Sequence, residues 1–188
     1  MCGRYTLFTD REIEDLEDIL AKIDDDVKKE RMKTGEIFPS EIVPVLIRQS
    51  DEIKPRLLTW GFPGYKKKQL IINARAESAG EKPMFRSALE SRRCVIPSTG
   101  FYEWDRNKRK YLFNMPDSDM LYMAGLYHRF EEEDRFVILT RDANASVAPI
   151  HHRMPVVLEQ MHIRNWLSDR DAALSILSGS GPELEKVF

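Results

Sequence analysis

Cys2 is the residue of this sequence with the most chemistry open to it, because it directly follows the initiator Met1. A small side chain at this position normally allows Met1 to be removed, which leaves the α-amine and the thiol of Cys2 on adjacent carbons. Reference pKa values are about 7.7–8.0 for the amine and about 8.5 for the thiol, so a fraction of each is nucleophilic at neutral pH. Such a 1,2-aminothiol can condense with an aldehyde, first as an imine and then by closing a thiazolidine ring. A cysteine that only packs under the first strand fits this position equally well.

Asn73 and Arg75 follow the apolar run 70–72, which has the composition of a short strand. An amide at the end of a strand can fix the orientation of a reacting group by hydrogen bonding. The planar guanidinium of Arg75 has the donors to grip a phosphate. An asparagine turn and a surface ion pair between Arg75 and Glu77 are the alternatives without a function.

Glu103 is a single carboxylate inside the aromatic segment 100–104. Burial in such a segment would raise the pKa of Glu103 toward the range that suits general acid and base catalysis. Strand alternation places Glu103 on the same face as Phe101 and opposite Tyr102 and Trp104. That face is either turned inward or solvated, and the residues alone favour the solvated orientation.

His151 and His152 stand side by side shortly before Pro155. A histidine in a site titrates near neutral pH and can serve as a proton carrier. Neighbouring side chains on an extended chain point in different directions, so we do not expect this pair to bind a metal together. A turn histidine without a role is the alternative.

Basic residues occur in short runs that are interleaved with aromatic residues. The runs are 66–68, 92–93 and 106–110, and the nearby aromatic residues are Tyr65, Tyr102 and Trp104. Cations interleaved with rings suit a single-stranded nucleic acid, whose phosphates need charge and whose bases can stack. Ordinary charged hairpins would have the same composition.

The composition indicates one domain that spans residues 1–188, because 188 residues with 42% apolar side chains can bury one substantial core. A net charge of -2 excludes a wholly basic nucleic-acid binder but allows a local basic groove. Cys2 and Cys94 are the only cysteines, which argues against a disulfide framework and against a structural zinc site. The sequence has no signal-peptide pattern and no apolar run of membrane-spanning length, so we expect a cytoplasmic protein.

The pattern of apolar residues predicts an α+β fold. Thr9 and Glu12 form a capping box, and apolar residues then recur at helical spacing as far as Ile23. Further helices are expected at 84–91, 161–167 and 172–177, and strands at 42–47, 57–62, 94–96, 101–104, 111–113, 121–127, 136–140 and 156–158. Helices that flank the strands without alternating with them favour a largely antiparallel, barrel-like sheet. The acidic run 131–134 is interpreted as a solvated hairpin loop.

An ordered set of motifs resembles that of the SOS-response-associated peptidase (SRAP) family. The motifs are Met-Cys-Gly-Arg at residues 1–4, Trp-Gly at 60–61, Asn-Ala-Arg-Ala-Glu at 73–77, Arg-Cys-Val-Ile-Pro at 93–97, Gly-Phe-Tyr-Glu-Trp at 100–104 and His-His-Arg-Met-Pro at 151–155. The resemblance extends from Cys2 to about Leu158. It implies binding of single-stranded DNA and a covalent crosslink to abasic sites through Cys2 after removal of Met1, as part of the response to DNA damage.

The resemblance also implies a role for individual residues. Cys2 would be the nucleophile, Asn73 would position its amine, Glu103 would move protons during imine and thiazolidine formation, and His151 would assist opening of the deoxyribose. The implied DNA-binding residues are Arg4, Arg75 and Arg153 as phosphate contacts, with Tyr65 and Pro39 as further candidates.

The sequence departs from the family pattern in three places. Family members commonly carry an Asn-x-x-Pro segment where this chain has Glu36 to Pro39, so only Pro39 matches. The loop 62–66 lacks a tryptophan that is often found there, which leaves Tyr65 as the stacking candidate. The segment after Leu158 is short and resembles little.

Two other functions fit the same residues. One is a thiol peptidase or autopeptidase that uses Cys2, and the other is a protein that binds single-stranded DNA without a covalent bond. For the crosslinking function we expect imine chemistry of the lyase type, single-stranded DNA with abasic sites as the partner, and no metal or other cofactor. We also expect a monomer that stays away from membranes and is associated with the nucleoid when bound to DNA.

Overall fold

A computed structural model describes residues 2–9, 13–66 and 68–187 of the chain. Its helices are α1 (Glu14–Ala21), α2 (Asp26–Lys29), α3 (Ala76–Ala79), α4 (Pro83–Ser91), the 3-10 helix η1 (Gln160–His162), α5 (Ile163–Ser168) and α6 (Arg170–Ser178). Its strands are β1 (Tyr5–Leu7), β2 (Gly35–Ile37), β3 (Ile42–Gln49), β4 (Glu52–Trp60), β5 (Phe62–Pro63), β6 (Leu70–Ile71), β7 (Asn73–Arg75), β8 (Arg93–Ser98), β9 (Gly100–Trp104), β10 (Lys110–Asn114), β11 (Leu121–Phe130), β12 (Glu133–Asp142), β13 (Arg153–Pro155), β14 (Val157–Leu158) and β15 (Glu185–Lys186).

The larger sheet closes on itself. Its strands follow the order β12-β4-β3-β8-β11, and β11 pairs again with β12, so five strands form a barrel. All pairs in this ring are antiparallel except β12 with β4, which pair in parallel over Arg135 and Phe136. The predicted α+β fold with a largely antiparallel, barrel-like sheet is confirmed.

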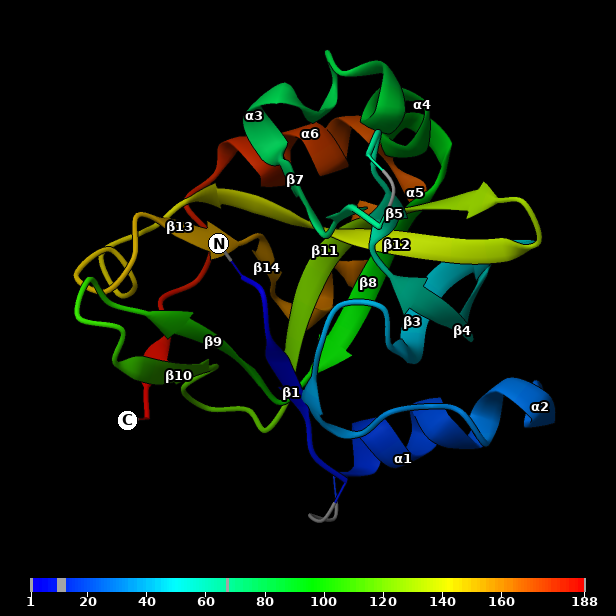
Figure 1. The fold of residues 1–188 in the computed structure, drawn as a ribbon, viewed down its shortest axis with the longest axis horizontal. Coiled ribbons are helices and arrows are strands. Elements are labelled where there is room, and N and C mark those ends of the chain that lie inside the picture. Colours follow the sequence, from blue (N-terminus) through cyan, green and yellow to red (C-terminus); the bar gives the residue numbers. More distant parts are fainter. Residues whose placement is uncertain (1, 10–12, 67, 188) are drawn as a thin grey trace.

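A second antiparallel sheet lies against the barrel, with the order β15-β10-β9-β1-β2. Figure 1 shows β1, β9 and β10 to the left of the barrel strands. The backbone N–H of Thr99, in the turn between β8 and β9, donates to the Thr6 carbonyl at 2.8 Å and so ties β1 to the end of the barrel. The Tyr5 ring packs on the Trp60 ring with centroids 5.3 Å apart, which joins the two sheets through their aromatic cores.

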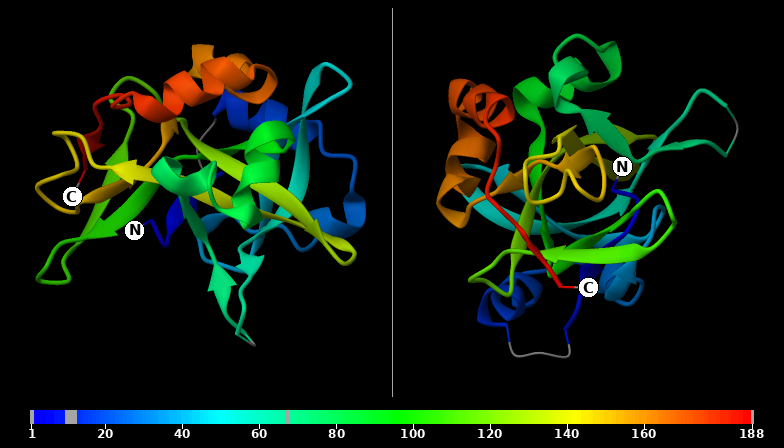
Figure 2. Two further views of the ribbon diagram at one scale, coloured as in Figure 1. Left: turned by 90° about the horizontal axis from the view of Figure 1, so that it is seen from above. Right: turned by 90° about the vertical axis from the view of Figure 1, so that its left-hand side faces the viewer.

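The helices cover two opposite sides of the sheets. In Figures 1 and 2, α3, α4, α5 and α6 lie on one side of the barrel, and α1 with α2 lies on the other. Helix α5 is anchored by Trp166, whose indole N–H donates to the Cys94 carbonyl of β8 at 2.8 Å. Trp166 is fully buried, so the indole N–H, its only polar side-chain group, needs a partner inside the protein, and this hydrogen bond provides one.

The predicted helices and strands differ from the observed ones mainly at their ends. The capping box includes Glu12, which lies outside the described residues; α1 begins at Glu14, and Ile13 occupies the N-cap without a side-chain hydrogen bond. The strand predicted at 57–62 is interrupted at Gly61 between β4 and β5. The predicted apolar face of α1 is present, since Leu16 and Ile19 are buried.

The acidic run 131–134 is only in part the solvated loop that the sequence predicts. Glu131 and Glu132 form the exposed turn between β11 and β12, but Glu133 and Asp134 already belong to β12. The Asp134 carboxylate is buried and pairs with Arg56 at 3.0 Å and with Arg129 at 3.8 Å. Basic partners on neighbouring strands allow this carboxylate to be buried, and the sequence alone does not reveal them.

Gly125 provides a test of this packing, because β11 runs between β8 and β12 at that residue. A Cβ there would lie 2.5 Å from Ile96 Cδ1 and 2.8 Å from the Val137 carbonyl oxygen. Gly125→Ala should therefore destabilise the protein by roughly 1–3 kcal/mol, the usual range for overpacking. Gly80→Ala is the matched control, since its Cβ would meet only Leu89 at 3.8 Å. Urea unfolding measures both, and equal stabilities of the two variants would contradict this account of the packing.

Candidate active site

Cys2 lies immediately before β1, and its side chain is fully buried. The thiol lies 3.9 Å from the carbonyl oxygen of Arg4, to which it can donate a weak hydrogen bond. Burial and the nearby charge of Glu103 raise the pKa of the Cys2 thiol well above its ordinary value. The expectation that a fraction of the thiol ionises without help is therefore wrong for this buried state, and the thiol needs a base to become nucleophilic. The predicted removal of Met1 concerns a residue outside the described part of the chain.

Asn73 holds the backbone of Cys2. Its side-chain Nδ2 donates to the Cys2 carbonyl oxygen at 2.9 Å across 71 residues of sequence. Asn73 begins β7 and does not end the preceding strand as predicted; β7 pairs in parallel with β12, opposite Ile138. The Asn73 Oδ1 atom is buried and has no hydrogen-bond partner among the described residues. A buried acceptor beside Cys2 is therefore open to a donor on a ligand or on the N-terminal amine.

Glu103 is buried, with an exposed fraction of 2%, so the solvated orientation favoured by the residues alone is wrong. The predicted alternation holds, because Phe101 on the same face stacks on Phe113 in the core with centroids 5.4 Å apart. Burial raises the pKa of Glu103, and the nearby His151 counteracts part of this effect. A carboxyl group with a raised pKa can both accept and release a proton near neutral pH.

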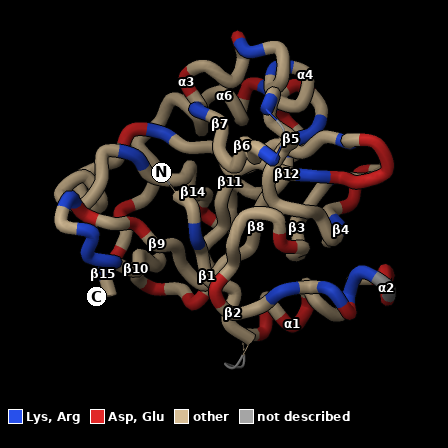
Figure 3. Tube along the Cα trace, viewed as in Figure 1, with Lys and Arg blue, Asp and Glu red and all other residues tan. Residues whose placement is uncertain are grey.

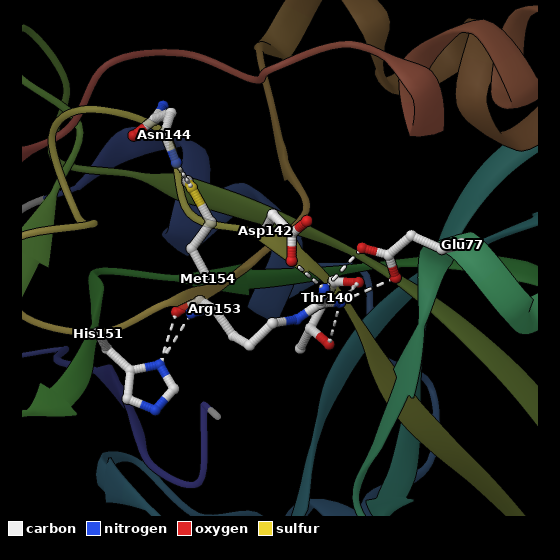
Figure 4. Close-up of polar contacts among 7 residues, drawn as sticks. All are labelled: Glu77, Thr140, Asp142, Asn144, His151, Arg153 and Met154. Carbon is white, nitrogen blue, oxygen red and sulfur yellow. Dashed lines mark hydrogen bonds and ion pairs between the residues drawn. The ribbon is translucent and has the colours of Figure 1, made fainter.

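His151 lies beside Glu103, with its Nδ1 atom 3.9 Å from Glu103 Oε1. The imidazole turns back on its own chain, and the backbone N–H of Arg153 donates to Nδ1 at 3.0 Å (Figure 4). This contact fixes the orientation of the ring relative to β13. His152 is exposed, and its ring lies on that of His151 with centroids 4.5 Å apart. Of the two histidines, the structure brings His151 to Glu103.

Arg153 is poorly placed for the phosphate contact that the resemblance implies. Its guanidinium is buried and binds both oxygens of Glu77 at 2.6 and 3.0 Å, as well as Asp142 at 2.7 Å. It also donates to the Thr140 carbonyl at 2.7 Å (Figure 4). Through these contacts Arg153 connects β13 to β12 and to α3. Glu77 pairs with Arg153, and not with Arg75 as in the alternative without a function.

Arg4 lies on the outer face of the second sheet. Its guanidinium is 3.2 Å from Glu36 Oε2 and lies over the Phe38 ring at 4.3 Å and the Trp104 ring at 5.3 Å. The other oxygen of Glu36 accepts from Lys110 at 2.6 Å. Arg4 is therefore partly neutralised by the carboxylate of Glu36.

The remaining predicted DNA-binding residues lie at the surface. Arg75 is exposed at the end of β7, two residues after Asn73. Tyr65 has an exposed fraction of 91% in the loop between β5 and β6, and Pro39 is partly exposed just after β2. Figure 3 shows acidic residues concentrated at the tip of the β11–β12 hairpin, whereas basic and acidic segments are interspersed around the strands near the N-terminus. An open pocket bordering His151 is lined by Trp104, Asp105, Arg106, Asn107 and residues 148–152.

Tyr5 is a site residue that the sequence analysis does not identify. Its hydroxyl is buried without a hydrogen-bond partner among the described residues. Burial raises the pKa of Tyr5, and the charges of Cys2 and Glu41 act in the same direction. All three residues of β1 are buried, so strand alternation in the sequence does not single out Tyr5.

Two kinds of structural feature are absent from the described residues: a group of metal ligands and a membrane-spanning helix. No cluster of three or more His, Cys, Asp or Glu side chains in ranges 2–9, 13–66 and 68–187 is arranged to hold a metal ion. Within the same ranges, no helix has the length and apolar character needed to cross a bilayer.

Comparisons with known proteins agree with the motif set. The model of the SOS response associated peptidase (SRAP) family matches residues 1–183. Abasic site processing protein YoaM of Bacillus subtilis is 33% identical over 190 residues, covering 92% of this chain and 82% of YoaM. Abasic site processing protein YedK of Escherichia coli is 27% identical over 200 residues, covering 97% of this chain and 88% of YedK. The chain belongs to the SRAP family.

A solved structure shares the fold. The X-ray structure of a protein from Bacteroides thetaiotaomicron has a TM-score of 0.78 and a sequence identity of 24%, and the match covers 98% of this chain and 90% of that one. At this identity the likeness concerns the fold alone.

The buried Glu103 predicts a stability that depends on pH. Because burial raises its pKa, the folded protein keeps a proton that the unfolded chain releases above about pH 4.3, and stability falls as the pH rises between the two pKa values. The Glu103→Gln side chain does not ionise, so this variant does not lose stability in this way as the pH rises. It should therefore be more stable than the wild-type protein at neutral pH, and the difference should shrink as the pH falls toward 4.

Glu77→Gln is the control of opposite sign for this experiment. The hydrogen bond from Arg153 lowers the pKa of Glu77, so its contribution is present at neutral pH and is lost as the pH falls. Denaturant unfolding at several pH values measures both variants. A Glu103→Gln variant that is less stable than wild type at neutral pH would show that this carboxylate is stabilised and not strained by its surroundings.

Proposed function

We propose that the protein processes abasic sites in single-stranded DNA by forming a covalent thiazolidine between Cys2 and the abasic aldehyde. The observation that carries the proposal is the convergence of four residues from separate segments of the chain. Asn73 contacts the Cys2 carbonyl at 2.9 Å, Glu103 raises the pKa of the Cys2 thiol, and His151 lies 3.9 Å from Glu103. The names of the relatives YoaM and YedK, abasic site processing proteins, support the same class of substrate.

The first chemical step needs the α-amine of Cys2, which exists only after Met1 is removed. The amine attacks the C1′ aldehyde of the ring-opened deoxyribose, and loss of water leaves an imine. The open Oδ1 atom of Asn73 is a suitable acceptor for an amine proton, and the Nδ2 contact holds the Cys2 carbonyl in place. His151 would supply or remove the proton that opens the sugar ring.

The second step closes the ring. The Cys2 sulfur attacks the imine carbon, its proton passes to the nitrogen, and the C–S bond completes the thiazolidine. Since burial keeps the thiol protonated, a base must take its proton, and Glu103 is the nearby group whose raised pKa suits that transfer. In this account Glu103 serves first as the acid that helps water to leave and then as the base for the thiol.

Phosphate contacts would hold the strand over the site. Arg75 is exposed next to Asn73 and Arg4 follows Cys2 closely, so both cations flank the nucleophile. Phosphate contacts position a strand without reading its sequence, so binding should vary little among sequences. Arg153 has no part in these contacts, because its guanidinium is occupied by Glu77 and Asp142.

Removal of the Cys2 thiol tests the covalent step. Cys2→Ala keeps an N-terminal amine but cannot close the ring, so the adduct that survives denaturing gel electrophoresis should disappear. The remaining imine can drain into β-elimination, which would appear as slow nicking of the strand. Cys94→Ala is the matched control, because Cys94 is a buried core thiol on β8 and should not be needed for the adduct.

Three outcomes would overturn this proposal, and two of them would favour one of its rivals. A denaturation-stable adduct formed equally by Cys2→Ala would remove the thiazolidine. Cys2-dependent turnover of fluorogenic peptides in place of an adduct would favour the peptidase. Wild-type protein that binds the strand but never crosslinks would favour the non-covalent binder.

Substitutions of the proton carriers test the assignment of roles. Glu103→Gln and His151→Ala should slow adduct formation by about 10²–10⁴-fold while DNA binding persists, since this is the usual contribution of general acid or base help. His152→Ala is the matched control, because its ring is exposed beside His151. Single-turnover crosslinking rates give the comparison, and a larger defect in His152→Ala than in His151→Ala would overturn the assignment.

A further inference from the structure

The carboxylate of Glu36 holds two cations at once on the outer face of the second sheet. Oε1 accepts a hydrogen bond from Lys110 Nζ at 2.6 Å, and Oε2 lies 3.2 Å from Arg4 Nη1. The hydrogen bond from Lys110 lowers the pKa of Glu36, so the carboxylate is ionised at neutral pH. One negative group with two oxygens therefore bridges two positive groups.

Strand order explains why these residues meet. Within the order β10-β9-β1-β2, Lys110 pairs with Trp104, and Thr6 pairs with Glu36. Tyr102 and Trp104 occupy the positions of β9 between the two cations, with Lys110 Nζ lying 3.8 Å from the Tyr102 ring centroid. The two cations are thus held by rings as well as by Glu36.

This cluster is accessible to a ligand. The side chains of Arg4, Glu36 and Lys110 have exposed fractions of 29%, 33% and 32%. The Phe38 ring, 4.3 Å from the Arg4 guanidinium carbon, is itself 41% exposed. Cations next to an open aromatic face are suited to a nucleic-acid strand, which carries phosphates and bases in alternation.

We propose that Arg4 and Lys110 form one phosphate-binding subsite, and that Glu36 fills it in the free protein until a phosphate of the DNA strand takes its place. The inference rests on the proposed function, because it assumes that single-stranded DNA is the ligand. It assigns a part to Lys110 and Glu36, neither of which belongs to the motifs that resemble the SRAP family.

The chemistry of the two anions makes the exchange reasonable. A carboxylate and a phosphodiester each carry one negative charge shared by two oxygens, so each can accept from Arg4 and Lys110 together. While Glu36 remains, the subsite has a net charge of one positive unit and the carboxylate repels an approaching phosphate. Glu36 therefore lowers the affinity for DNA, whereas an uncharged residue at this position would leave both cations free.

Binding to single-stranded DNA without an abasic site tests the exchange apart from the covalent chemistry. Fluorescence anisotropy over a range of salt concentrations gives the Kd and its salt dependence. Glu36→Gln should bind roughly 3–10-fold more tightly at low salt, and its log–log salt slope should steepen by about 0.7, the value for one more charge neutralised on a single strand. Glu90→Gln is the matched control, because Glu90 also pairs at 2.6 Å, with Arg170 on α6.

Lys110→Met should have the opposite effect, with weaker binding and a slope shallower by about 0.7. The double variant Glu36→Gln/Lys110→Met should return to near the wild-type affinity, because the subsite again has one net positive charge. Thermal unfolding of each variant checks that the sheet is intact, and Glu36→Asn serves as a second variant if Glu36→Gln is destabilised.

The proposal is overturned if Glu36→Gln and Glu36→Asn bind no more tightly than Glu90→Gln, or if Lys110→Met binds as tightly as wild type. These results leave the proposed function standing if the wild-type protein still crosslinks abasic DNA. Conversely, tighter binding by Glu36→Gln without any crosslink in the wild-type protein would support the subsite and remove the covalent function. A protein that binds no single-stranded DNA would exclude both.

Discussion

Both edges of β12 must find backbone partners along the whole strand, and much of the structure follows from how they do so. One edge pairs with β11 over residues 133–138 and then with β13 over residues 140–142. The other edge pairs with β4 at residues 135–136 and then with β7 at residues 138–140. The first half of β12 closes the barrel, and the second half carries the segments that hold Asn73 and His151. Because buried N–H and C=O groups must be paired, the closure of the barrel and the assembly of the site depend on the same strand.

The site combines a buried thiol with a buried carboxyl group, and each affects the other. Burial raises the pKa of both Cys2 and Glu103, and the charge of Glu103 raises that of Cys2 further. Both groups therefore hold their protons to a higher pH than they would in water. The ion pairs of Arg153 with Glu77 and Asp142 support this arrangement from outside, because the Arg153 backbone N–H orients His151.

Charged residues occur in small local groups of one sign and do not give a whole face of the protein one sign of charge. The chain has a net charge of -2, and its most concentrated acidic segment lies at the tip of the β11–β12 hairpin (Figure 3). Around the site, several cations already have acidic partners, as Arg4 and Lys110 have Glu36. A net charge near zero gives a protein little long-range attraction for a polyanion, so any contact with one depends on local groups of cations. Net charge alone is thus a poor guide to nucleic-acid binding here.

The sequence by itself determined the α+β class, most of the long strands and the identity of the candidate residues Cys2, Asn73, Glu103 and His151. Periodicity and motif order are local properties, so they can be read without the fold. The tertiary structure decided that Glu103 is buried, because alternation separates the faces of Glu103 and Trp104 but does not say which side chains the core covers. It also decided that Arg153 is an internal ion-pairing residue and that Glu36 holds Arg4. The Arg4–Glu36 and Arg153–Glu77 contacts join residues more than 30 positions apart, and only the pairing of distant segments determines them.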